Sequence, residues 1–177
     1  QLMKWIYRPV GAINEMSNLP LGLRARLAQE TIYHPCATVT ILRSRDGTRK
    51  YLLALQDGEL IESVYIPEAD RSTVCISSQV GCQMGCTFCA TGNMGFTRNL
   101  TAGEIVDQVL QVMLDVGSRP SNVVYMGMGE PLANYDRLIE SIKILNAPWG
   151  LKIGIRQITV STCGLVPGIR KLAKEGL

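Results

Sequence analysis

The spacing of hydrophobic and polar residues changes near residue 37, and the two patterns predict different structures. In the first thirty residues, Asn18 can cap a helix and Pro20 can begin it, ahead of a run of good helix formers over 21–30. After residue 37 the chain is rich in β-forming residues, with turn signals at Asp46-Gly47 and Asp57-Gly58. We therefore expect a helical start and then an antiparallel meander with strands at 37–42, 50–55 and 60–66.

From residue 71 onward, short apolar runs alternate with stretches of helical periodicity. Thr101 and Glu104 form a T-x-x-E capping box, which predicts the start of a helix whose apolar face includes Ile105 and Val109. Three strand-then-helix pairs predict a parallel sheet with helices on its outer face and ligands at the carboxyl ends of the strands. The expected strands are 73–77, 122–126 and 155–161, and the later helices are 135–145 and 166–175.

A short polar connector at 67–70 separates the two patterns. We expect an α/β fold, with a small α+β accessory domain over 1–70 and part of a (βα) barrel, about three βα units, over 71–177. Three units leave the barrel unclosed, with an exposed sheet edge. Because the chain begins at Gln1 and ends just after Gly176, which is typical of a helix C-cap, we expect a fragment of a longer protein.

Composition adds limits on location and partners. With 46% hydrophobic and 19% charged residues the chain is typical of a soluble globular protein, and no apolar run of about eighteen residues predicts a membrane span. Lys4, Arg8 and Glu15 interrupt any signal-peptide core, so a cytoplasmic location is expected. The six cysteines favour metal or redox chemistry in a reducing compartment, and the net charge of +3 permits a polyanionic partner.

The most informative motif is a cysteine triplet, Cys82, Cys86 and Cys89, with C-x3-C-x2-C spacing. Three soft thiolates so close together are typical ligands of an iron-sulfur cluster, and three ligands leave one iron open to another molecule. Structural zinc is the main alternative, but it needs a fourth ligand and the only histidine, His34, lies far upstream. A simple electron carrier would also need a fourth cysteine, so we favour a cluster with an open iron.

Glycines surround the triplet at 81, 85, 92 and 95, and they allow the backbone to approach a bound group closely. The segment Gly127-Met-Gly-Glu130 follows the second expected strand of the parallel sheet. It offers a polar pocket at the same edge of the sheet as the triplet. Taken alone, this segment also fits an ordinary βα turn, in which glycines are common.

The triplet, with Phe88 before its last cysteine, resembles the cluster motif of the radical S-adenosylmethionine (SAM) superfamily. Four further strings are similar to the RlmN/Cfr family, the dual-specificity adenine-C2 methyltransferases of ribosomal and transfer RNA. The similarity extends over essentially the whole chain. The strings are Tyr65-Ile-Pro-Glu68, Arg71-Ser-Thr-Val-Cys-Ile-Ser-Ser-Gln-Val-Gly-Cys82, Gly95-Phe-Thr-Arg-Asn-Leu100 and Gly127-Met-Gly-Glu-Pro131.

This resemblance implies a 4Fe-4S cluster on Cys82, Cys86 and Cys89, with S-adenosyl-L-methionine bound to the open iron through its amino and carboxylate groups. Reduction of SAM would then release a deoxyadenosyl radical, which is chemistry that the cofactor supplies. Gly129 and Glu130 match the family's SAM-binding pair. Ser161 matches a further SAM contact at the end of the third expected strand.

The resemblance also implies transfer through a methylated cysteine, with the RNA adduct released when a second cysteine forms a disulfide with the first. Cys75 matches that second cysteine, although composition alone favours a small buried hydrophobic residue on a strand. Glu62 matches a position assigned as proton acceptor, a role for which Cys75 competes. The methyl-carrying cysteine has no counterpart here, so this chain alone is expected to be incomplete for catalysis. Cys36 and Cys163 are expected to be packing residues.

The implied partners are rRNA and tRNA substrates and an electron donor such as a flavodoxin-type reductant, for a monomeric enzyme without a membrane. Two alternatives remain: a C8-specific adenine methyltransferase relative, which the single residue Pro131 disfavours, and an inactive iron-sulfur or zinc-binding fragment. Several basic residues could contact phosphates, although a solvated surface explains them equally well. They are Arg24, Arg26, Arg43, Arg45, Arg49 and Lys50.

Overall fold

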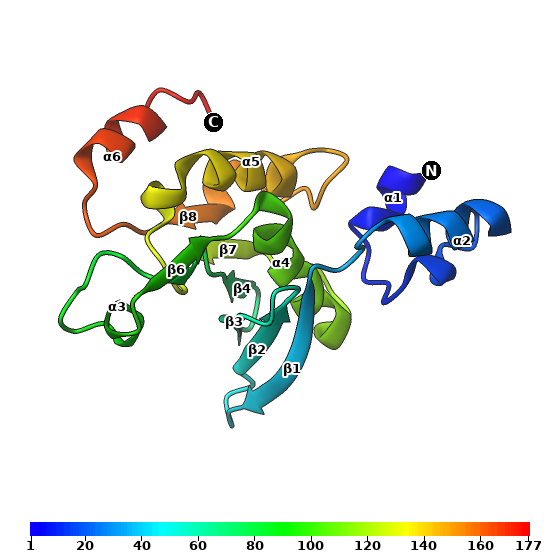
Figure 1. The fold of residues 1–177 in the computed structure, drawn as a ribbon, viewed down its shortest axis with the longest axis horizontal. Coiled ribbons are helices and arrows are strands. Elements are labelled where there is room, and N and C mark those ends of the chain that lie inside the picture. The colour runs from blue at the N-terminus through cyan, green and yellow to red at the C-terminus, as the bar shows by residue number, and fades with distance from the viewer.

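The first part of the chain is a helical unit with a small core of its own (Figure 1). The structure, a computed structural model, describes residues 1–177. The expected helix over 21–30 is confirmed as α2 (Leu21–Glu30). Asn18 does not cap it, because its side-chain oxygen accepts a hydrogen bond from the Trp5 indole instead. The remaining elements of the unit are α1 (Leu2–Ile6) and the 3-10 turn η1 (Ile13–Glu15), and its buried residues are Ile13, Met16 and Leu19.

The meander expected after residue 37 is confirmed as three antiparallel strands, β1 (Cys36–Arg43), β2 (Arg49–Leu55) and β3 (Leu60–Pro67). Gly47 and Gly58 each turn with a φ of 86°. That backbone conformation strongly favours glycine, which is why the two Asp-Gly pairs form the hairpin turns.

One six-stranded sheet carries both the meander and the parallel strands, in the order β1-β2-β3-β4-β7-β8. The strands β4 (Ser72–Cys75), β7 (Asn122–Tyr125) and β8 (Ile158–Val160) are parallel, as expected for successive βα units, and β8 forms an edge. Because β3 pairs antiparallel with β4, the sheet continues across the connector at 67–70. The division into domains 1–70 and 71–177 therefore stays a prediction about folding units within one continuous sheet.

Helices cover one face of this sheet and form the main core with it (Figure 1). Helix α4 (Ala102–Val116) begins at the predicted capping box, in which the Glu104 backbone donates to the Thr101 hydroxyl at 3.2 Å and the Thr101 backbone donates to the Glu104 carboxylate at 2.8 Å. Helix α5 (Tyr135–Asn146) packs beside α4, and α6 (Val166–Leu172) follows β8. None of the helices combines the length and apolar character needed to cross a membrane.

The parallel strands β4 and β8 are both shorter than expected, and the early end of β4 changes the chain path that leads to the cysteine triplet. β4 ends at Cys75, because the chain turns into a separate antiparallel hairpin of β5 (Gln79–Gly81) and β6 (Phe96–Asn99) that was not predicted. Strand β8 begins at Ile158 and not at residue 155, because residues 155–157 form the 3-10 turn η3 (Ile155–Gln157).

The uncovered face of the sheet presents a row of aligned residues. Backbone pairing places Lys50 opposite Val64, Val64 opposite Cys75, and Cys75 beside Val124. Cys75 is partly exposed, whereas its neighbour Val74 is buried under the helices. Because successive strand residues point to opposite faces, Cys75 points to the face that forms the interior of a barrel.

Candidate functional site

The cysteine triplet lies on a loop that the β5–β6 hairpin closes at its base. The Cys82 backbone N–H donates to the Gly95 carbonyl at 2.8 Å, and Gly81 has a φ of 72°. A Cβ at residue 81 would lie 2.0 Å from the Gly95 oxygen, so only glycine permits this crossing of the two backbones. The hairpin therefore sets where the loop leaves the core.

Within the loop, the three cysteines of the triplet are free thiols and partly exposed. The Cys89 N–H donates to the Cys86 carbonyl at 3.0 Å, just before the short helix α3 (Ala90–Asn93). No group of three or more Cys, His, Asp or Glu side chains is arranged as a metal site in the structure. The fit to an iron-sulfur cluster therefore rests on donor chemistry, since three uncommitted thiols on one glycine-rich loop are suitable ligands.

The Gly127–Glu130 segment, which follows β7, packs tightly against the chain that follows β4. A Cβ at residue 127 would lie 2.7 Å from the Ser77 hydroxyl, and a Cβ at residue 129 would lie 2.5 Å from the Gln79 Cβ. Gly129 also has a φ of 95°, which a side chain would strain. The two glycines thus let the segment lie directly beside the base of the cysteine loop.

Glu130 is buried, and its carboxylate holds two neighbouring segments. One oxygen accepts from the Leu132 backbone at 2.9 Å and so caps the 3-10 turn η2 (Pro131–Asn134), and the other accepts from the Cys163 backbone at 2.7 Å. These bonds join the end of β7 to the chain that follows β8. Each carboxylate oxygen has two lone pairs, so both retain acceptor capacity.

Gln79 is a site residue that the sequence analysis did not single out. Its side chain is fully buried, its carbonyl accepts from the Glu130 backbone at 2.8 Å, and its amide donates to the Asn99 side chain at 2.7 Å. Asn99 ends β6, so Gln79 connects the hairpin under the cysteine loop to the Gly-Glu segment. The residues between Cys75 and Val80 are Ile76-Ser-Ser-Gln79, which are mostly polar, so no signal in the sequence set Gln79 apart.

The chain that follows β8 brings two predicted residues to the same edge of the sheet. Ser161 is exposed, and its N–H lies 3.4 Å from the Tyr125 carbonyl. Cys163 is also exposed, so its expected role as a packing residue is wrong. Partial desolvation and the nearby Glu130 carboxylate raise the pKa of its thiol to about 11. The packing interpretation of Cys36 is confirmed, because that residue is buried in the main core.

Cys75 and Glu62 lie on the open face of the sheet, on neighbouring strands. Burial raises the pKa of the Cys75 thiol. Glu62 lies two positions from Val64, the partner of Cys75, so the two side chains share one face. The Glu62 carboxylate forms an ion pair with Lys50 at 2.8 Å, and its backbone carbonyl accepts from the Ser77 hydroxyl at 2.7 Å.

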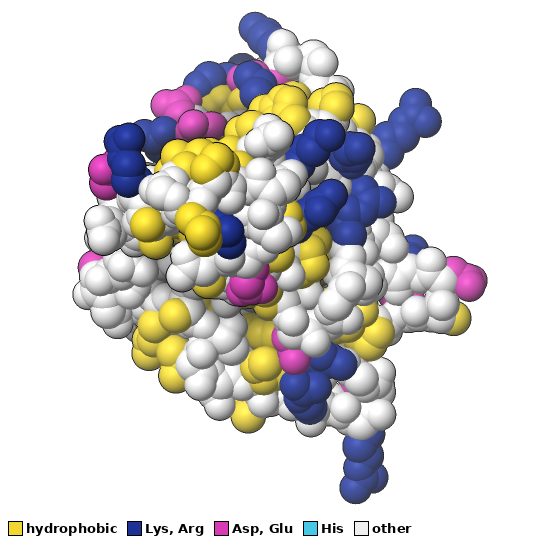
Figure 2. Space-filling view, turned by 90° about the vertical axis from the view of Figure 1, so that its right-hand side faces the viewer, with side chains coloured by type: hydrophobic (Ala, Val, Ile, Leu, Met, Phe, Trp, Pro, Cys, Tyr) yellow, Lys and Arg dark blue, Asp and Glu magenta, His cyan; other side chains and the backbone are white.

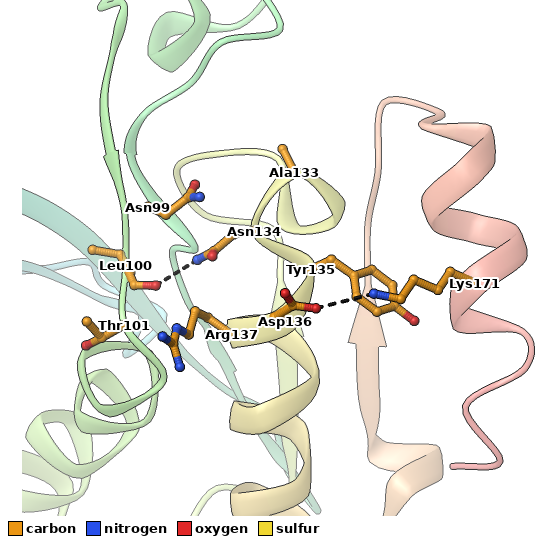
Figure 3. A pocket seen from close by; sticks show the side chains of 9 residues that line it. All are labelled: Asn99, Leu100, Thr101, Ala133, Asn134, Tyr135, Asp136, Arg137 and Lys171. Atoms are coloured by element: carbon orange, nitrogen blue, oxygen red, sulfur yellow. Dashed lines mark hydrogen bonds and ion pairs between the residues drawn. The ribbon is translucent and has the colours of Figure 1, made fainter.

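A separate cavity of about 610 Å³ lies between the end of β6, the start of α5 and the end of α6 (Figure 3). Asn134 reaches across its wall and donates to the Leu100 carbonyl at 2.8 Å, and Lys171 pairs with Asp136 at 3.3 Å. None of the predicted site residues lines this cavity. These contacts join the end of β6 to the start of α5, and α5 to α6.

Comparison with known proteins now decides the family. The sequence profile of the radical SAM superfamily matches residues 76–177, which cover the cysteine loop, the Gly-Glu segment and β8. The chain belongs to the radical SAM superfamily. Proteins of this superfamily use a 4Fe-4S cluster and SAM, in agreement with the cofactors expected from the triplet.

Relatives of about 50% sequence identity show which radical SAM proteins this chain resembles. The chain is 50% identical to a probable dual-specificity RNA methyltransferase RlmN of Pelotomaculum thermopropionicum and 48% identical to a dual-specificity RNA methyltransferase RlmN of Syntrophobacter fumaroxidans. These matches cover 100% and 99% of the chain, but 49% and 52% of the relatives. The chain thus spans about half the length of the curated relatives it matches.

A solved structure supports the same grouping. The chain superposes on a radical SAM methyltransferase from Sphaerobacter thermophilus with a TM-score of 0.94 and 45% identity, over 99% of this chain and 53% of that one. The expected partial radical SAM barrel is therefore confirmed as the fold.

Proposed function

We propose that this chain is the radical SAM half of an enzyme that methylates C2 of adenine in 23S rRNA and tRNA through a methyl-cysteine intermediate. The observation that supports this most directly is the hydrogen-bonded link from Gln79 to Glu130 and on to Cys163. It gathers the cysteine loop, the Gly-Glu segment and the chain after β8 at one edge of the sheet, while Cys75 lies on the open face. Relatives named as dual-specificity RNA methyltransferases support the reaction class.

In this proposal Cys82, Cys86 and Cys89 hold a 4Fe-4S cluster, and the adjoining segments bind SAM. When bound, the cluster and SAM supply the methyl group and the radical chemistry. The close approach of Gly129 to Gln79 brings the backbone of the Gly-Glu segment to the base of the cysteine loop, where the methionine end of SAM would bind. Glu130 accepts a hydrogen bond from the SAM ammonium in addition to its two backbone bonds, and Ser161 contacts SAM from the end of β8.

Cys75 and Glu62 act on the RNA adduct from the open face of the sheet. Glu62 removes the C2 proton as the adduct gives up one electron, which the bound cluster would accept. The Cys75 thiolate then attacks the sulfur that links protein to base, and the disulfide forms as the bond from that sulfur to the linking carbon breaks. The electron pair left on this carbon takes up a proton and so completes the methyl group. The burial that raises the pKa of the Cys75 thiol means that it needs a base or a change in its surroundings to react as thiolate.

The proposal also includes the substrates, the electron donor and the location of the enzyme. The substrates are rRNA and tRNA, an electron donor such as a flavodoxin-type reductant supplies the electron, and the enzyme works as a monomer in the cytoplasm. The methyl-carrying cysteine belongs to the part of the protein outside these residues. The accessory domain over 1–70 adds a meander to the barrel sheet and extends it on the side of β4.

The proposal is tested with the full-length enzyme, anaerobically reconstituted with iron and sulfide and supplied with a reductant, SAM and unmodified tRNA or rRNA. We expect 2-methyladenosine in digested RNA, detected by mass spectrometry. The matched control is Cys86→Ala, which removes one thiolate of the triplet. Methylation at C8, or cofactor turnover without any methylated RNA, would refute the proposal.

A further inference from the structure

A groove at the N-terminal end of the chain combines aromatic and basic side chains and has no acidic residue in its lining. It lies between α1 and the loop that connects α5 to η3, with a volume of about 700 Å³. Tyr7 and Trp149 provide the aromatic rings, and Lys4, Arg8 and Lys152 provide the charges. Neither the cluster site nor any proposed catalytic residue is part of this groove.

The aromatic rings leave a surface on which another ring can stack. The Tyr7 and Trp149 ring centroids are 5.8 Å apart, with the rings tilted by 48°. The Trp149 side chain nevertheless remains 51% exposed. A large, half-exposed indole that is steadied by a second ring is the kind of platform on which unpaired nucleic-acid bases stack.

The loop that carries Trp149 is braced by several backbone contacts. A Cβ at residue 150 would lie 2.0 Å from the Ile144 oxygen, so the loop packs directly on the end of α5. Arg119 donates to the Leu151 carbonyl at 2.9 Å and to the Lys152 carbonyl at 2.5 Å. The platform is therefore formed in advance, which lowers the entropic cost of binding.

The positive charges of the groove are free to bind an anion. Lys4, Arg8 and Lys152 form no ion pair in the structure, whereas Lys50 and Lys171 do. Figure 2 faces the side of the molecule that carries the N-terminal helices and shows Lys and Arg side chains over much of it, with Asp and Glu side chains beside some of them. Unpaired cations beside an aromatic platform match the phosphates and bases of a single strand.

We propose that this groove binds an unpaired segment of the RNA substrate, with a base stacked on Trp149 and phosphates beside Lys4, Arg8 and Lys152. The inference rests on the proposed function, which makes RNA the substrate. In Figure 1, α1 and the cysteine loop around α3 lie at opposite ends of the molecule. The groove therefore holds a different part of the RNA from the reacting adenine, and this second attachment raises the overall affinity.

The test compares binding of a short oligouridylate and of substrate tRNA to full-length enzyme variants over a range of salt concentrations. Trp149→Ala is expected to raise Kd for the oligouridylate by about fivefold to hundredfold, and Trp149→Phe should restore most of the affinity. Lys4→Gln and Lys152→Gln should each reduce the slope of log Kd against log salt by about 0.7. Lys174→Gln is the control, because it removes a cation from a surface next to α6 that has no aromatic lining.

The outcomes separate this inference from the proposed function. Unchanged Kd and salt slope in folded Trp149→Ala and Lys152→Gln enzymes would overturn the groove and leave the methylation activity standing. A loss with Lys152→Gln but not with Trp149→Ala would also overturn it, because the site would then bind phosphates without stacking a base. Weakened binding in both variants, in an enzyme that methylates no RNA, would support the groove and refute the proposed function.

Discussion

The side-chain carbonyl of Gln79 accepts a hydrogen bond from the backbone N–H of Glu130 at 2.8 Å, and this bond connects the two parts of the proposed cofactor site. Gln79 belongs to the hairpin below the cysteine loop, and Glu130 belongs to the segment after β7. Both residues are buried, so the bond is shielded from competition with water. The bond therefore adds a buried side-chain link to the backbone bonds that hold the Gly-Glu segment beside the cysteine loop, such as the one from the Ser78 N–H to the Met128 carbonyl at 2.8 Å.

Replacing Gln79 with Met keeps the side-chain length but removes both hydrogen bonds. It leaves the Glu130 N–H without a partner in the interior, which costs about 1–3 kcal/mol. We expect the free energy of unfolding to fall by that amount and Kd for SAM to rise about tenfold, with the iron content unchanged. Chemical denaturation and equilibrium binding of SAM check the two effects.

Gln111→Met is the matched control, because Gln111 is also a buried glutamine but bonds to Thr38 and Asp107, away from the cysteine loop. It should lose stability and keep the SAM affinity of the parent. An equal loss of SAM affinity in both variants would show that Gln79 has only a general structural role.

Replacing Gly129 with Ala tests the close approach between this glycine and Gln79. The added Cβ would meet the Gln79 Cβ at 2.5 Å, in a backbone with a φ of 95°. Gly58→Ala is a matched control, since Gly58 has a φ of 86° and open space around its Cβ position. The control should cost about 1 kcal/mol of stability from backbone strain alone.

For Gly129→Ala we expect a larger loss of stability than for the control, together with a loss of SAM binding. The thermal midpoint and the Kd for SAM measure the two quantities. Similar midpoints for the two variants would mean that the segment can move away from Gln79 at little cost.

The contact between His34 and Asp107 predicts a pH dependence of stability. The Nδ1 atom of His34 lies 2.5 Å from an Asp107 carboxylate oxygen, and its Nε2 atom lies 3.0 Å from the Val10 carbonyl oxygen. Both partners are acceptors, so the protonated ring satisfies both contacts. Burial acts to lower the pKa of His34, but the Asp107 hydrogen bond and charge outweigh it, and the pKa is raised above 6.5.

A raised histidine pKa contributes stability that is fully present below about pH 6.5 and is lost as the pH rises through the higher pKa of the folded protein. We therefore expect the free energy of unfolding to decline above pH 6.5 in the parent, and to decline less in His34→Gln. Denaturant titrations across this range measure the difference. Parallel pH profiles for the two proteins would contradict the assignment.

Replacing Cys75 with Ala in the full-length enzyme tests the resolving role. Without the thiol that displaces the linking sulfur, the RNA should remain covalently attached to the protein. The adduct would appear as an RNA-dependent shift on a denaturing gel. Cys163→Ala is the control, because Cys163 is exposed at the other side of the Gly-Glu segment and should permit turnover. Normal turnover by Cys75→Ala would exclude the role.

Local signals in the sequence were sufficient for most elements. The Asp-Gly turns, the capping box at Thr101 and the apolar periodicity of α4 and α5 depend on residues close together in the chain, and all of them were predicted correctly. The cysteine triplet was also recognisable from its spacing, because its three thiols lie on one loop, and its role as the set of cluster ligands stays a prediction. Asn18 was misread as a cap because Trp5, thirteen residues away, binds it.

The sequence by itself determined the order of the meander strands and of the βα units, the family and the candidate ligands, since each of these depends on neighbouring residues or on a contiguous motif. Only the tertiary structure decided that β3 and β4 join in one sheet, that β5 and β6 form a separate hairpin, and that Gln79 connects this hairpin to Glu130. Gln79 and Glu130, for example, lie about fifty residues apart in the chain. Such contacts depend on how buried polar groups find partners in the folded core, and residue periodicity carries no record of that pairing.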